Sequence, residues 1–300
     1  MYHIPVMLNE CINGLNIKPD GVYVDVTFGG GGHSRRIMES LGKEGRLYAF
    51  DQDEDAAKNI IDDDRFTFIQ ENFRYMKNFV QLYCGGKVDG LLADLGVSSY
   101  QFDTAEKGFS IRYNGRLDMR MDKNASVDAA SVVNTYDVGS LARLFSRYGE
   151  LKNSMNIANA IVMHREMNRI ETTDELKEAV ARLLPKGSEN KVLAQIFQAL
   201  RIEVNEEMKV LEIFLKQCAD VLKPGGRLVV LSYHSLEDRL VKNFMKTGNA
   251  DGILEKDFFG NQLTPYKLVN SKPIVPDDEE ILHNNRARSA KLRIAERRDK

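Results

Sequence analysis

The sequence predicts an α/β fold in which a Rossmann-like parallel sheet carries an inserted all-helical domain. Two observations support this prediction. Apolar segments alternate with helical patterns over residues 22–96, which is typical of parallel strands joined by covering helices. The alternation stops between residues 107 and 205, where only helical patterns occur, and a strand pattern returns at residues 227–233.

Each element follows from a local pattern. The expected strands are VYVDVTF at 22–28, RLYAFD at 46–51, RFTFIQ at 65–70, VDGLLADLG at 88–96, RLVVLSY at 227–233 and the alternating C-terminal ARSAKLRIAERR. The expected helices between the first four strands are RRIMESL at 35–41, AAKNII at 56–61 and YMKNFVQLY at 75–83. In the helical stretch, TTDELKEAV begins with a capping pattern at Thr173. A long amphipathic helix then ends at Lys223-Pro224-Gly225-Gly226.

These patterns divide the chain into two domains. We expect residues 1–106 and 206–300 to form one discontinuous α/β domain around a helical insert at 107–205. The insert has 15 Lys and Arg against 12 Asp and Glu, whereas the rest of the chain has 27 against 32. Arg112, Arg116 and Arg120 recur every four residues, and the last fifteen residues are also basic. This charge is either a phosphate-binding surface split between insert and tail, or ordinary solvated surface.

Composition excludes several classes of protein. The chain has 300 residues, of which 43% are hydrophobic, and a net charge of −2, so no global basic field indicates nucleic acid. Three cysteines without a CxxC exclude a disulfide framework, and five histidines without HxH or HxxxH make a metal site unexpected. Neither a secretory signal nor an apolar run long enough for a membrane span is present. We therefore expect a cytoplasmic protein without bound metal.

Four glycines follow the first strand in DVTFGGGGHS, at residues 25–34. No Gly-Lys-Ser/Thr follows them, which excludes a P-loop, and the GxGxxG dinucleotide pattern is incomplete. In register with Asp25, however, the loop resembles motif I of S-adenosylmethionine (SAM) methyltransferases, D/E-x-G-x-G-x-G. Gly29 and Gly31 then occupy two of its glycine positions, while Thr27 occupies the third. The loop thus predicts a nucleoside cofactor beside a helix N-terminus.

Two residues after the next strands fit the same cofactor. Asp51 ends LYAFD twenty residues after Gly31, where a carboxylate can accept both ribose hydroxyls of either NAD or SAM. Its neighbour Asp53 is expected to cap the following helix. Phe73, just past the third strand, either packs on the adenine or belongs to the core.

The end of the fourth strand separates methyl transfer from hydride transfer. It reads Asp94-Leu95-Gly96-Val97-Ser98-Ser99, where amino-group methyltransferases often have Asn/Asp-Pro-Pro-Tyr/Phe. Asp94 occupies the polar position, but Leu95-Gly96 replaces the prolines. The motif is therefore only partly met by these residues.

A much closer resemblance covers the chain from His3 to the C-terminus. The segments DVTFGGGGHSR, LLADLGVSSYQFD, EKGFS, GRLDMRMD, FQALRIEVNEE, LKPGGRLVVLSYHSLEDRLVK and NRARSAKLRIAER together resemble the RsmH (MraW) family of bacterial 16S rRNA cytosine-N4 methyltransferases. The resemblance implies a class I SAM-dependent fold and methylation of a cytidine amine in the decoding region of the small ribosomal subunit. It places SAM against Gly31, Gly32, His33, Asp51, Phe73, Asp94 and Gln101. The sequence departs from the family pattern at Tyr100 and at Asn190-Lys191, and the region around 247–285 is short.

The residues themselves are compatible with amine methylation. Methylation at cytosine C5 would need a cysteine nucleophile, and none of Cys11, Cys84 and Cys218 lies in a suitable motif. An amine target needs groups that aim it and accept its hydrogen bonds. The catalytic candidates are Asp94, Asp118 and His234. The substrate-binding candidates are Ser98, Ser99, Arg116, Arg120 and Ser232.

Purely structural roles are also open for two of the catalytic candidates. Asp118 could simply pair with Arg116 or Arg120, and His234 could cap a helix that begins at Ser235. Two other functions also stay open at this level: an NAD(P)-dependent oxidoreductase, and a SAM- or nucleotide-sensing RNA-binding module without catalysis. The expected partners are 16S rRNA and the small ribosomal subunit, with no membrane. The oligomeric state is left open, homo-oligomerisation included.

Overall fold

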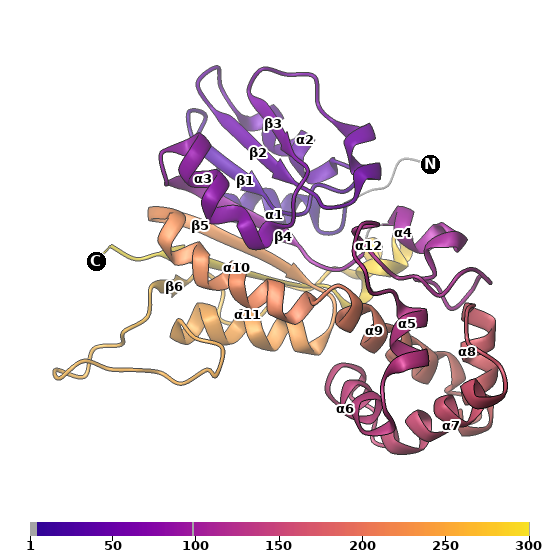
Figure 1. Ribbon diagram of the computed structural model, residues 1–300. Helices are drawn as coiled ribbons and strands as arrows, with labels where there is room; N and C mark the ends of the chain where they lie inside the picture. Colours follow the sequence, from indigo (N-terminus) through magenta and orange to yellow (C-terminus); the bar gives the residue numbers. More distant parts are fainter. Residues whose placement is uncertain (1–4, 98, 300) are drawn as a thin grey trace. The chain divides into compact units, whose positions relative to one another are not determined.

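The computed structural model describes residues 5–97 and 99–299, and the chain divides into two compact units (Figure 1). The first comprises Met1–Gly96 with Met208–Lys300, and the second comprises Val97–Glu207. The helical unit therefore starts at Val97 instead of residue 107. The fourth strand ends at Asp94, and the chain enters the new unit almost at once.

The first unit is built on a seven-stranded sheet in the order β3-β2-β1-β4-β5-β7-β6. Strands β1 to β5 pair in parallel, and β7 and β6 are antiparallel. The strands are β1 (Val22–Asp25), β2 (Arg46–Phe50), β3 (Phe66–Ile69), β4 (Val88–Asp94), β5 (Leu222–Ser232), β6 (Tyr266–Leu268) and β7 (Lys291–Arg297). The predicted class I Rossmann-like sheet is confirmed. Its strand order reverses between β1 and β4, where open α/β sheets bind ligands.

Helices cover both faces of this sheet (Figure 1). They are α1 (Leu8–Leu15), α2 (Gly32–Ser40), α3 (Met76–Cys84), α10 (Glu207–Val221) and α11 (Ser235–Thr247). A short helix, α12 (Asp278–His283), packs beside the 3₁₀ helix η5 (Asn285–Ser289). Successive residues of β4 face opposite sides of the sheet. Leu91 packs with residues of α3, α10 and α11, whereas Leu92 packs with residues of α1 and α2. This two-sided burial explains why the strands are almost continuously apolar.

Several details of this unit differ from the sequence prediction. Strand β1 ends at Asp25, before the predicted residue 28, and β4 ends at Asp94, before the predicted residue 96. Residues 56–61 were expected to be helical, but the chain there forms a 3₁₀ helix, η1 (Glu54–Asn59). Strand β5 begins at Leu222, so the Pro-Gly-Gly segment lies within the strand, where the register with β4 shifts between Val88 and Gly90. Strand β6 was not predicted, because three residues are too few to show an alternating pattern.

The second unit is helical around its own apolar core. Its helices are α4 (Ser99–Asp103), α5 (Ala129–Thr135), α6 (Val138–Gly149), α7 (Ser154–Met167), α8 (Thr173–Val180) and α9 (Glu189–Val204). The cap of α8 is Thr172, one residue before the predicted Thr173. Thr172 accepts from the Glu175 backbone N–H, and the Glu175 side chain accepts from the Thr172 N–H, which completes a capping box. No helix in the described ranges has the length and apolar character needed to span a membrane.

Candidate functional site

Acidic residues stand at the carboxyl ends of the parallel strands β1, β2 and β4. Asp25 is the last residue of β1 and is almost fully buried. Its carboxylate accepts the Thr27 N–H at 3.0 Å and the Ser34 hydroxyl at 2.7 Å. The Thr27 hydroxyl in turn accepts the Asp94 backbone N–H at 2.7 Å. Asp25 therefore holds the loop after β1 in place and ties it to the end of β4.

The glycine loop turns sharply before helix α2. Gly29 and Gly31 have φ of 50° and 75°, in the left-handed region that favours glycine. Gly31 is the N-cap of α2 and supplies no side-chain cap, so backbone N–H groups of the first turn stay available. A helix N-terminus of this kind attracts an anion such as an amino-acid carboxylate.

The loop offers a matched pair of glycine substitutions. In Gly31→Ala, the new Cβ lies 2.8 Å from an Arg35 guanidinium nitrogen and 3.0 Å from the Phe28 ring, at a positive φ. We expect a loss of about 1–2 kcal/mol in unfolding free energy, together with weaker SAM binding. Gly30→Ala is the control, because a Cβ there meets no heavy atom within 4 Å. Thermal melts and calorimetric SAM titrations measure both, and equal effects of the two substitutions would contradict the expectation.

Asp51 follows β2 directly and faces the glycine loop. One carboxylate oxygen accepts the Gly29 N–H at 2.8 Å, and the other accepts the Asp53 N–H at 2.9 Å. Each oxygen keeps a lone pair, so both ribose hydroxyls of a nucleoside could still donate to them. Burial raises the pKa of Asp51 to about 6. Asp53 caps η1 by accepting from the Asp55 N–H, which confirms the prediction for that residue.

His33 connects the glycine loop to the N-terminal segment. This buried side chain donates from Nε2 to the Val6 carbonyl at 3.1 Å, while Nδ1 lies 3.6 Å from the Asp94 carboxylate. A Cβ on Gly32 would lie only 2.2 Å from Pro5 Cγ, so the missing side chain makes room for this segment. The packing of Pro5 and Val6 against the loop was not predicted, because nothing local to either segment indicates it.

Asp94 ends β4 with its side chain 23% exposed. One oxygen accepts the Tyr233 hydroxyl at 2.6 Å, and the other faces His33. Burial raises the pKa of this carboxyl, while His33 and Tyr233 lower it. Tyr233 was not among the predicted site residues. Its position as the last residue of the predicted strand 227–233 was the available indication, since side chains at the carboxyl ends of parallel strands gather at one edge of the sheet.

Phe73 lies in η2 (Phe73–Tyr75), after β3. Its half-buried ring packs edge-on against Phe214 with centroids 5.4 Å apart. The neighbouring Asn72 donates to the Gln52 side chain at 2.6 Å. The core contact is therefore present, and the partial exposure leaves part of Phe73 for an adenine contact.

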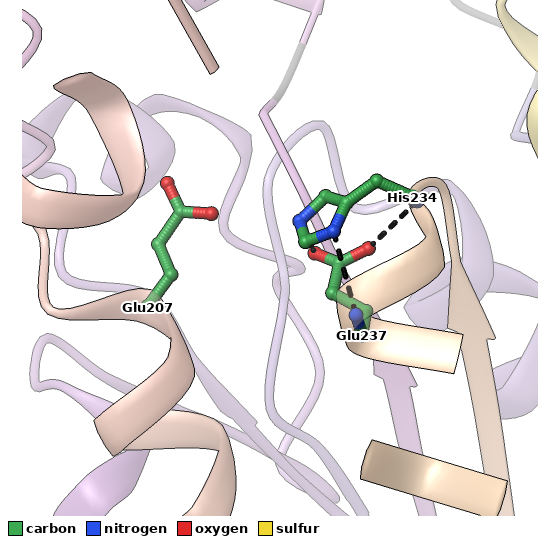
Figure 2. A group of neighbouring side chains, drawn as sticks. All are labelled: Glu207, His234 and Glu237. Atoms are coloured by element: carbon green, nitrogen blue, oxygen red, sulfur yellow. Dashed lines mark hydrogen bonds and ion pairs between the residues drawn. The ribbon is translucent and has the colours of Figure 1, made fainter. Parts of the chain in front are cut away.

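His234 and Glu237 form the start of α11 (Figure 2). His234 Nδ1 accepts the Glu237 N–H at 3.4 Å, and a Glu237 oxygen accepts the N–H groups of Tyr233 and His234. The capping role of His234 is thus confirmed. Ser232, by contrast, is buried, and its hydroxyl donates to the Lys291 carbonyl on β7 at 3.3 Å. Figure 2 also draws Glu207, which pairs with Arg201 at 2.8 Å.

The other predicted site residues belong to the second unit. Asp118 pairs with Arg120 through two bonds of 2.7 Å, which confirms the structural role considered for it. Arg116, which is 61% exposed, pairs with Asp128 at 3.1 Å. Gln101 is buried on α4, which begins at Ser99. Ser98 lies outside the described residues.

Comparisons with known proteins show the family of the chain. The family model described as the MraW methylase family matches residues 1–298. The chain is 58% identical over 297 residues to the ribosomal RNA small subunit methyltransferase H of Bacteroides fragilis, covering 99% of this chain and 98% of that one. The protein of the same name from Flavobacterium psychrophilum is 59% identical over 292 residues, covering 97% and 100%. A match over the whole length at this identity establishes the relationship. The chain therefore belongs to the MraW methylase family, and its methyl donor is SAM.

Proposed function

We propose that this methylase transfers a methyl group from SAM to the exocyclic N4 of a cytidine in the decoding region of small-subunit 16S rRNA. The observation that carries the proposal is Asp94, a partly exposed carboxylate held by Tyr233 at the sheet edge that also has the glycine loop and Asp51. Membership of a methylase family removes the oxidoreductase alternative. The relatives' names give ribosomal RNA of the small subunit as what they methylate, which supports this class of substrate.

The residues at this edge fit the donor. The free N–H groups at the start of α2 suit its carboxylate, and Asp51 suits its ribose hydroxyls. SAM, when bound, supplies a methyl group on a positively charged sulfur. Gly31, Gly32 and His33 are proposed to line its amino-acid part, with Phe73 beside the adenine. Gln101, on α4 of the second unit, stays a prediction.

Asp94 is proposed as the catalytic acceptor. The cytosine amine is a poor nucleophile because its lone pair is delocalised into the ring. An ionised Asp94 that accepts an N4–H bond aims the amine and stabilises the positive charge that develops on nitrogen as the N–C bond forms and the S–C bond breaks. The N4 proton then leaves to Asp94 or to water. A preoriented carboxylate does this better than solvent.

The cysteines support amine methylation over C5 methylation. Cys11 and Cys218 are fully buried, and burial raises their pKa values well above the ordinary range. Burial raises the pKa of Cys84 to about 11. All three thiols therefore stay protonated near neutral pH and are poor nucleophiles.

The decisive experiment is methyl transfer to the proposed substrate. Small ribosomal subunits that lack the modification are incubated with the protein and labelled SAM, and the methyl is mapped by mass spectrometry of rRNA fragments. We expect one N4-methylated cytidine in the decoding region. Label on another atom, or no label at all, would refute the proposal. Absence of label in a protein that still binds SAM would favour a sensing module. Action on ribosomal subunits also implies a cytoplasmic enzyme.

We further propose that the helical unit contacts rRNA phosphates. Arg112 is exposed, and its guanidinium makes no hydrogen bond or ion pair within the part of the chain that the structure describes, whereas Arg120 is engaged by Asp118. Arg112→Ala should weaken rRNA binding at every sequence and reduce the slope of log affinity against log salt by about one. Arg120→Ala should mainly lower thermal stability. Filter binding at several salt concentrations measures the slopes, and an unchanged slope for Arg112→Ala would contradict this role.

A further inference from the structure

Tyr233 lies between two carboxylates in the turn from β5 to α11. Its backbone N–H donates to Glu237 at 2.8 Å, and its hydroxyl donates to Asp94 at 2.6 Å. The three residues come from the end of β4, the turn after β5 and the first turn of α11. Tyr233 therefore links the first turn of α11 to the proposed catalytic carboxylate through one hydrogen bond at its backbone and one at its side chain.

Glu237 fixes the turn that carries Tyr233. Its side chain is only 4% exposed, and one of its oxygens accepts the N–H groups of both Tyr233 and His234. His234 returns a bond by accepting the Glu237 N–H (Figure 2). Reciprocal bonds of this kind hold the backbone before a helix in one conformation. The direction of the Tyr233 side chain is thus set by the start of α11.

Gly96 gives the Tyr233 ring its space. Its φ is +101°, and a Cβ there would lie 3.3 Å from the ring. The segment after Asp94 therefore passes close against Tyr233, which leaves the ring little freedom to swing away from the carboxylate.

We propose that Tyr233 and Glu237 are positioning residues for methyl transfer, which together hold the Asp94 carboxylate in the orientation that accepts the target amine. This inference rests on the proposed function. Asp94 has two oxygens with two lone pairs each. Tyr233 occupies one lone pair on one oxygen, so the carboxylate cannot rotate freely and its remaining lone pairs keep fixed directions.

Charges around Asp94 give the proposal a pH signature. Burial and the nearby Asp25 and Glu237 raise its pKa, while His33 and the Tyr233 hydroxyl lower it. Burial and Asp94 itself raise the pKa of Tyr233 well above the usual range, so this hydroxyl stays a donor. Loss of the hydroxyl removes a bond made to the ionised form of Asp94. The pKa of Asp94 should then rise, and the acidic limb of the rate profile should move to higher pH.

The main test is Tyr233→Phe in the full-length protein, assayed on unmodified small subunits. We expect kcat to fall about tenfold, as for a lost hydrogen bond to a charged group, while KM for SAM stays within about twofold. The matched control is Tyr266→Phe. Tyr266 is also a buried tyrosine, but its hydroxyl has no hydrogen-bond partner among the described residues, so the substitution should leave kcat and the pH profile unchanged.

Glu237 supplies a second test with a conservative rescue. Glu237→Ala removes the acceptor and should lower kcat about as much as Tyr233→Phe does. Glu237→Gln keeps an oxygen for both N–H groups and should restore most of the rate. The double variant Tyr233→Phe/Glu237→Ala should be little worse than either single variant, because both changes break the same chain of bonds.

The outcomes separate this proposal from the proposed function. Wild-type kcat and an unmoved acidic limb in Tyr233→Phe would overturn the positioning role while methylation by the wild type stands. Equal losses in Glu237→Gln and Glu237→Ala would overturn the role of Glu237. If the wild type methylates nothing, the carboxyl resonance of Asp94, titrated by carbon NMR without SAM, still tests the contact. An equal Asp94 pKa in wild type and Tyr233→Phe would then refute it.

Discussion

Asp94→Asn should lower kcat for methyl transfer by about 100-fold or more, with SAM affinity within a few-fold of wild type. The amide can still accept the Tyr233 hydroxyl, so the fold at the end of β4 should persist. It lacks the negative charge that stabilises the developing positive charge on N4. Single-turnover rates on unmodified small subunits, with calorimetric SAM binding, measure the two quantities separately.

Asp89→Asn is the control for this substitution, because Asp89 lies near the other end of the same strand. Its carboxylate accepts the Val22 N–H at 3.0 Å and pairs with Lys223 at 2.7 Å. We expect a modest loss of stability and an unchanged kcat. A wild-type rate in Asp94→Asn, or an equal loss in Asp89→Asn, would show that Asp94 is not the catalytic acceptor.

Asp51→Ala should weaken SAM binding about 100-fold. Two hydroxyl bonds to an ionised carboxylate are lost, and together they contribute roughly 3 kcal/mol of binding free energy. Asp53→Ala is its neighbour control. Asp53 caps η1, so its loss should cost about 1 kcal/mol of stability with little change in SAM affinity. Comparable losses of affinity in the two variants would contradict a ribose contact for Asp51.

The same residue makes SAM binding depend on pH. Because burial raises the pKa of Asp51 to about 6, the carboxyl is ionised at pH 7 and above and protonated at pH 5. Ribose hydroxyls donate best to the ionised form. Affinity should therefore be constant above pH 7 and fall as the pH drops through 6, approaching tenfold per pH unit. In Asp51→Ala this pH dependence should disappear. Calorimetric SAM titrations between pH 5 and pH 8 measure it, and a dependence that persists in the variant would contradict the expectation.

Local patterns predicted much of the site. Asp25, Asp51 and Asp94 lie in or at the ends of predicted strands, and parallel strands bring their carboxyl ends to one edge. Two of those predicted strands, 22–28 and 88–96, ran past the ends that the structure gives at Asp25 and Asp94. The cap at Asp53 and the helix start at His234 are also local, because a capping side chain bonds within three residues of itself. Such features depend on a few neighbouring residues and are visible in a sequence.

The sequence prediction was wrong in details where neighbouring residues allow two local structures. Thr172 and Thr173 are adjacent and equally suited to capping, and only the reciprocal bond from Glu175 selects Thr172. The 3₁₀ form of η1 and the strand extension through Pro224 likewise depend on neighbouring elements. In each case two local structures have similar propensities, and packing decides between them.

The sequence alone predicted the fold class and, through its resemblance, the family, and it also indicated the glycine loop and the acidic residues near it. Only the tertiary structure brought together residues far apart in the chain. Tyr233 bonds to Asp94, which lies 139 residues away in the sequence, and His33 bonds to Val6, which lies 27 residues away. It also engages the Ser232 hydroxyl with the Lys291 carbonyl. These contacts depend on strand register and helix placement, which are set by the packing of the whole unit, so no local pattern encodes them.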